Sequence, residues 1–130
     1  MNKTVIHILE HDTKQGSFLK YQLALSGFRN VHLFHLPAEC IYSLEKGNIP
    51  HFIIMDLEFS DISAEDFLER VKRISPDIKI IVFSIRDDAD YASLLLSSGI
   101  NDFIVRVGNN KAGIQELIAN LQFIIKETNL

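Results

Sequence analysis

The stretch His51-Phe52-Ile53-Ile54-Met55-Asp56 decides the fold, because an apolar run ends there in an acidic residue. Three further apolar runs end in polar residues in the same way: Val5 to Leu9 before Glu10-His11-Asp12, Ile78 to Phe83 before Ser84, and Phe103 to Val105 before Arg106. Near-continuous apolar runs of this length are typical of parallel strands covered on both faces. Neighbouring parallel strands would bring these polar ends together at one sheet edge, where open α/β sheets place their chemistry.

The rest of the chain alternates between two kinds of segment. Apolar runs predict strands at residues 4–9, 30–35, 51–56, 78–84 and 102–106. Apolar residues at helical spacing predict helices at 14–25, 38–46, from about 61–63 to 74, 88–98 and 110–128, with Asp61 or Ser63 capping the third. This alternation predicts an α/β fold with helices on both faces of a parallel sheet. The favoured topology is doubly wound and flavodoxin-like, with strand order 2-1-3-4-5.

Composition limits the classes of function. The 130 residues suit one domain, and 47% apolar with 23% charged residues is ordinary for a soluble protein. A formal charge of -4 argues against direct nucleic-acid binding. The single Cys40 excludes an internal disulfide and suits a reducing compartment. No apolar run reaches the ~18 residues of a membrane span, and Met1-Asn2-Lys3-Thr4 lacks the design of a signal peptide. We therefore expect a cytoplasmic protein without a membrane partner.

The spacing of these residues resembles the receiver domain of bacterial response regulators over essentially the whole chain, residues 1–130. The likeness rests on Glu10-His11 after the first strand, Gly27-Phe28 ending the first helix, Asp56, Ser84, Gly99 ahead of Asn101-Asp102-Phe103, and Arg106. It implies a CheY-like receiver in a two-component phosphorelay. Such a domain is a signalling domain and, beyond its own phosphorylation, not an enzyme.

The resemblance also implies a role for each residue of the site. Asp56 would accept a phosphoryl group from a histidine kinase or phosphotransfer protein, with Ser84 and Arg106 on the phosphoryl oxygens and Phe103 as the switch residue. Mg²⁺ would lie between Glu10, Asp12, Asp56 and the backbone carbonyl of Glu58. His11 is the alternative to Asp12, although imidazole is a poorer ligand than carboxylate for this hard ion.

The phosphorylated state would act on other proteins through the face formed by the fourth helix, the fifth strand and the fifth helix. Because the 130 residues leave no room for an output domain, the effect is expected to pass to a downstream protein partner. The same face could form a homodimer. An apolar patch there is expected from Leu94 and Phe123, since Leu94-Leu95-Leu96 cannot all point inward on a helix with one buried face.

Alternative interpretations remain open at this stage. The chain has His11, Arg106 and Val107 where the family has an acid, a lysine and a proline, which favours a phosphorylation-independent pseudo-receiver acting as an interaction or dimerisation module. Arg106 could form a static ion pair with Asp56 or Glu10, Ser84 could be a simple hydrogen-bonding residue, and Phe103 could be core. A cofactor-binding enzyme on the same sheet is disfavoured, because the loop at residues 10–14 is acidic rather than glycine-rich.

The histidines outside the acidic cluster are predicted to be structural residues rather than metal ligands. His7 interrupts the first strand and is predicted to be a hydrogen-bonded core residue, with metal binding a distant second. His32 and His35 have opposite parity on a strand and form no helical His-x-x-x-His pair, so they indicate no zinc site.

Overall fold

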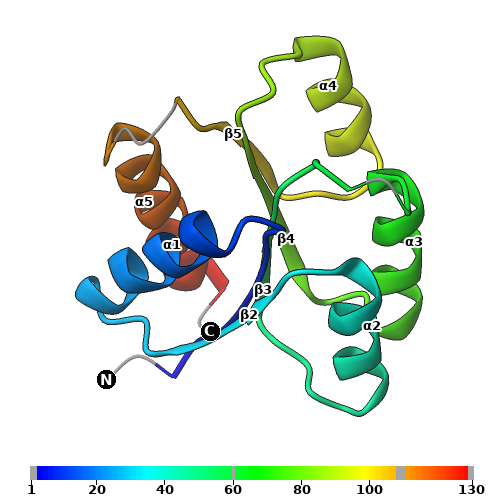
Figure 1. Cartoon of the computed structure of the whole chain (residues 1–130), viewed down its shortest axis with the longest axis horizontal. Coiled ribbons are helices and arrows are strands. Elements are labelled where there is room, and N and C mark those ends of the chain that lie inside the picture. Colours follow the sequence, from blue (N-terminus) through cyan, green and yellow to red (C-terminus); the bar gives the residue numbers. More distant parts are fainter. Residues whose placement is uncertain (1–2, 60, 108–110, 129–130) are drawn as a thin grey trace.

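The computed structural model describes residues 3–59, 61–107 and 111–128. Strands and helices alternate throughout this part of the chain (Figure 1). They are β1 (Val5–Leu9), α1 (Thr13–Leu25), β2 (Asn30–Phe34), α2 (Pro37–Glu45), β3 (Phe52–Met55), α3 (Ala64–Ile74), β4 (Lys79–Ser84), α4 (Ala89–Ser97), β5 (Asp102–Val105) and α5 (Lys111–Thr128). Every predicted strand and helix is confirmed, although residue 110, where the last helix was expected to begin, lies outside the described residues.

All neighbouring strands are parallel, and their order is β2-β1-β3-β4-β5. This is the predicted doubly wound arrangement. Helices α1 and α5 cover one face of the sheet, and α2, α3 and α4 cover the other (Figure 1). The central strand β3 is buried at every residue, as its uninterrupted apolar sequence requires.

Alternation along the strands supplies two hydrophobic cores. Ile6 and Ile8 of β1 pack with α1 and α5, whereas Leu9 of β1 and Ile53 of β3 pack with α2, α3 and α4. Successive side chains of a strand point to opposite faces, so one apolar run serves both cores. Each fully buried aliphatic side chain contributes about 1.5–3 kcal/mol relative to exposure, and these contacts hold the strand ends in place.

Local hydrogen bonds set where the helices beside the sheet edge begin. Asp12 caps α1, because its Oδ1 accepts from the backbone N–H groups of Lys14 and Gln15. Ser63, one of the two expected caps, accepts from the N–H of Asp66 at the start of α3. These caps place the loops after β1 and β3 beside the carboxyl ends of their strands.

The surface of α4 follows the sequence prediction. Leu95 is fully buried, whereas Leu94 and Leu96 are nearly half exposed. Phe123 on α5 is also exposed, as predicted. Within the described ranges, no helix combines the length and the apolar character needed to cross a membrane.

Candidate functional site

Polar side chains gather at the carboxyl edge of the sheet. Glu10 and Asp56 follow the last residues of β1 and β3, which pair in register, and Ser84 ends β4. Arg106 follows β5, and its N–H donates to the carbonyl oxygen of Ser84 at 2.6 Å. These four are buried, with exposed fractions of 8% or less. Buried ionisable groups require partners, so their contacts indicate what the site does.

Arg106 bridges the two buried carboxylates. Its Nη1 lies 3.2 Å from Glu10 Oε1 and donates to it, and its Nη2 lies 3.6 Å from Asp56 Oδ2. Its guanidinium also lies over the Phe83 ring, 5.5 Å from the centroid. The structure therefore shows both of the ion pairs that the alternative interpretation of Arg106 allowed. The positive charge of this residue is directed at the group expected to be phosphorylated.

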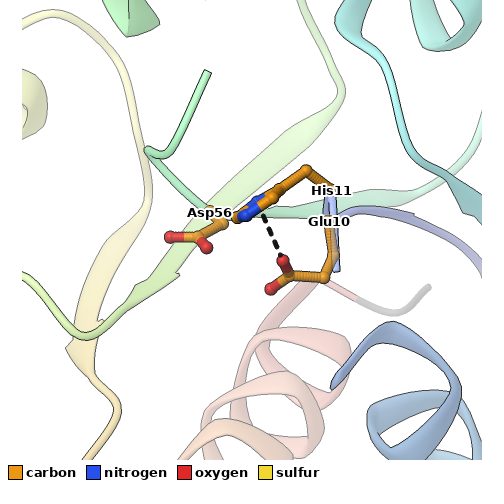
Figure 2. A group of neighbouring side chains, drawn as sticks. All are labelled: Glu10, His11 and Asp56. Atoms are coloured by element: carbon orange, nitrogen blue, oxygen red, sulfur yellow. Dashed lines mark ion pairs between the residues drawn. The ribbon is translucent and has the colours of Figure 1, made fainter. Parts of the chain in front are cut away.

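Glu10, His11 and Asp56 form a cluster of possible metal ligands. One ligand atom from each lies within 4.8 Å of the others, and His11 Nδ1 is 3.3 Å from Glu10 Oε2 (Figure 2). Asp56 Oδ1 accepts from the N–H of Leu57, but the buried Asp56 Oδ2 has no hydrogen-bond partner among the described residues. A buried acceptor without a donor is uncommon, and it marks a place where a cation or a reacting group fits.

Burial is the main influence on the ionisation of Glu10. Burial raises the pKa of Glu10, and the neighbouring Asp56 carboxylate raises it further. The Asp12 N–H, which donates to Glu10 Oε2 at 3.0 Å, and Arg106 act in the opposite direction. Burial is the largest of these causes, so a further cation in the cluster would stabilise the ionised carboxylates.

The two other expected ligands are placed differently. Asp12 uses its Oδ1 as the cap of α1 and is not among the residues whose ligand atoms converge, whereas His11 is. Glu58, whose backbone carbonyl is the expected ligand, lies in the loop after β3, and its role at a metal stays a prediction. Mg²⁺ is commonly held by one or two carboxylates together with water and phosphate oxygens. The oxygens of Glu10 and Asp56 fit that requirement, including Asp56 Oδ2, which forms an ion pair with Arg106 but no hydrogen bond among the described residues. His11 supplies no oxygen.

Ser84 connects the site to a group of residues that the sequence analysis missed. Its Oγ accepts from the N–H of Arg86 at 3.2 Å. The Arg86 guanidinium lies over the Tyr91 ring, and the Tyr91 hydroxyl donates to Glu65 of α3 at 2.7 Å. The loop after β4 thus contacts α4, and α4 contacts α3 through Tyr91. No spacing rule joins these residues, because the contact between Glu65 and Tyr91 depends on how the two helices lie side by side.

Phe103, the expected switch residue, is half-buried on β5. Its ring packs against the core shared by α2, α3 and α4. Its N–H donates to the side chain of Asp102, which fixes the local backbone. In this conformation Phe103 contributes to the core, and a role as a switch is a proposal.

The sequence matches the model of the response regulator receiver domain over residues 6–119. The chain therefore belongs to the receiver-domain family of two-component systems. Receiver domains are signalling domains that interact with kinases or phosphotransfer proteins and with downstream effectors, and they usually bind Mg²⁺.

Individual relatives are distant. The regulatory protein LuxO of Vibrio vulnificus is 33% identical over 61 residues, which are 47% of this chain and 14% of that protein. The uncharacterized transcriptional regulatory protein YesN of Bacillus subtilis is 26% identical over 78 residues, 60% of this chain and 20% of that protein. The chain thus spans a small part of the length of these regulators.

Solved structures agree on the fold. A two-component response regulator from Clostridium difficile has a TM-score of 0.85 at 20% identity, covering 98% of this chain and 100% of that chain. A receiver domain protein from Methanospirillum hungatei has a TM-score of 0.84 at 18% identity, covering 98% of each chain. At these identities the likeness concerns the fold alone.

Proposed function

We propose that residues 1–130 act as a single phosphorylatable receiver domain, which accepts a phosphoryl group on Asp56 from a histidine kinase or phosphotransfer protein. The observation that carries the proposal is the Asp56 carboxylate itself. It is buried at the end of the central strand and lies beside a second carboxylate and a guanidinium, and one of its oxygens accepts no hydrogen bond from the described residues. Such a group can act as a nucleophile, and the guanidinium beside it can offset part of the negative charge of the product.

The reaction is a phosphoryl transfer. A carboxylate oxygen of Asp56 forms a bond to phosphorus while the bond between phosphorus and the donor nitrogen breaks, and the product is an acyl phosphate. Asp56 Oδ2 is the candidate atom, because Oδ1 already accepts from the N–H of Leu57. Mg²⁺ held by Glu10 and Asp56 would supply positive charge to the phosphoryl oxygens.

Arg106 and Ser84 would serve the phosphorylated state. Arg106 must turn away from Asp56 Oδ2 to admit the phosphoryl group, and its guanidinium can then pair with a phosphoryl oxygen through charge-assisted hydrogen bonds. The Ser84 hydroxyl can donate to a second oxygen. Because Ser84 Oγ also accepts from the N–H of Arg86, this contact would act on the loop after β4 and on α4. A downstream protein would then recognise the changed face of α4, β5 and α5, with Phe103 as the switch.

Intact-protein mass spectrometry tests the proposal. The protein is incubated with acetyl phosphate or phosphoramidate and Mg²⁺, beside Asp56→Asn and the matched control Asp61→Asn, an exposed acid in the same loop. We expect one phosphoryl adduct that hydroxylamine removes, in wild type and Asp61→Asn but not in Asp56→Asn. An adduct that persists in Asp56→Asn would place the reaction elsewhere.

A pseudo-receiver is the second candidate, and the bridge from Arg106 to both carboxylates favours it. In that function the ion pairs are permanent, and the domain binds its partner without phosphorylation. The absence of an adduct with both donors, in Mg²⁺ and in Mn²⁺, would support this function and refute the first.

A further inference from the structure

A pair of histidines on the opposite side of β1 from its α1–α5 core plays no part in the chemistry of Asp56. His7 of β1 and His32 of β2 are direct partners in the parallel register, and their ring centroids are 5.6 Å apart. His7 is 2% exposed, whereas His32 is exposed. Both line an open pocket of about 450 Å³ between the edge of the sheet and the C-terminal end of α2.

His7 has an unsatisfied nitrogen. His7 is a core residue, as predicted, but its buried Nδ1 has no hydrogen-bond partner within the described ranges. Burial and the neighbouring His32 lower the pKa of His7 to about 4, which keeps the ring neutral. Phe34 packs against one side of the ring, 4.9 Å between centroids, and offers no polar partner. A neutral imidazole in this position can offer its lone pair to a cation.

A hydrogen bond fixes the tautomer of His32. Its Nε2 lies 2.8 Å from Asn30 Oδ1, an atom that can only accept, so Nε2 carries the proton. In the neutral ring the lone pair is then on Nδ1. Histidines that bind metals commonly donate their other ring N–H to a carbonyl or carboxylate in this way, which fixes the tautomer.

We propose that His7 and His32 form a second site, which binds a divalent transition metal such as Zn²⁺ through imidazole nitrogens. Neutral imidazole suits Zn²⁺, Cu²⁺ or Ni²⁺ far better than Mg²⁺, so this site and the carboxylate cluster select different ions. Ser43 and Asn48 line the same pocket and offer oxygen atoms, and water can complete a tetrahedral coordination. The exposed His32 ring can adjust when the metal binds, while His7 stays in the sheet.

Calorimetric titration of the tag-free full chain with Zn²⁺ tests the site, together with ¹⁵N-detected signals of the histidine rings. The informative variant is His32→Gln, because His32 is exposed and a change there is expected to leave the fold intact. His7→Phe is the second variant and retains an aromatic ring against Phe34. The control His11→Asn removes the imidazole of the carboxylate cluster.

We expect wild type and His11→Asn to bind Zn²⁺ alike, with shifts of the His7 and His32 ring nitrogens that Mg²⁺ does not produce. His32→Gln should weaken this binding by about tenfold or more. Unchanged affinity and ring shifts in His32→Gln would overturn the proposal. Loss of all Zn²⁺ binding in His11→Asn would also overturn it, because the metal would then belong to the carboxylate cluster. So would a wild type without Zn²⁺ binding, in which the two rings only make an edge-to-face contact.

Discussion

Replacing Arg106 by methionine should destabilise the protein by about 3 kcal/mol. Nitrogen–oxygen distances of 3.2 and 3.6 Å to Glu10 and Asp56 correspond to an attraction of about 5 kcal/mol each at an effective dielectric constant of about 20. Desolvation of the guanidinium and repulsion between the two carboxylates offset most of that sum. Removing one partner of a buried pair typically costs about 3–5 kcal/mol. We expect the lower end of that range, because the methionine side chain retains the packing of the aliphatic part of the arginine side chain.

Urea unfolding followed by circular dichroism measures this cost. The matched control is Arg73→Met, which removes an arginine from an exposed ion pair with Glu69 and should change stability by no more than about 0.5 kcal/mol. Added Mg²⁺ should stabilise Arg106→Met more than wild type, since the variant leaves both carboxylates without their guanidinium. Equal, small effects of the two arginine substitutions would refute the conclusion that Arg106 neutralises a buried acidic pair.

Further predictions concern Glu10, the leucines of α4 and Cys40. Because the pKa of Glu10 is raised above 4.5, its protonated form is favoured by folding, so stability should fall as pH rises above that value. Urea unfolding between about pH 4 and 7 should show that the free energy of unfolding falls less steeply with pH in Glu10→Gln than in wild type. Leu95→Ala should cost about 3 kcal/mol in thermal or urea unfolding, and the exposed Leu94→Ala less than about 0.5 kcal/mol. Cys40 is fully buried and its pKa is raised to about 12, so a thiol reagent should label it only after unfolding.

The fold could be predicted from the sequence because its signals are local. The run from Phe52 to Met55 is apolar at every position, and such a run needs cover on both faces. Because the strands are parallel, the polar residue after each strand lies at the same edge of the sheet. For this reason Glu10, Asp56 and Arg106 were expected together and are found together.

The partners of individual side chains could not be predicted in the same way. Asp12 or His11 was expected to complete the metal site, but the sequence did not show that Asp12 Oδ1 accepts from the N–H groups of Lys14 and Gln15. Arg106 could have faced either acid, and only the packed structure shows that it contacts both. The pairing of His7 with His32 follows from strand register, and helical histidine spacing carries no signal for it.

The hydrogen bonds around Asp12 have a practical consequence. Glu10 Oε2 accepts from the N–H of Asp12, whose own carboxylate accepts from the N–H groups of Lys14 and Gln15. Asp12 therefore connects the acidic cluster, through its backbone N–H, to the first turn of α1, through its carboxylate. Protonation of Glu10, or its binding to a metal, should weaken Glu10 Oε2 as an acceptor for the Asp12 N–H. Asp12 would then be held less firmly, and the start of α1 should fray more. Amide hydrogen exchange at Lys14 and Gln15 can thus report the charge of a carboxylate that no solvent probe reaches.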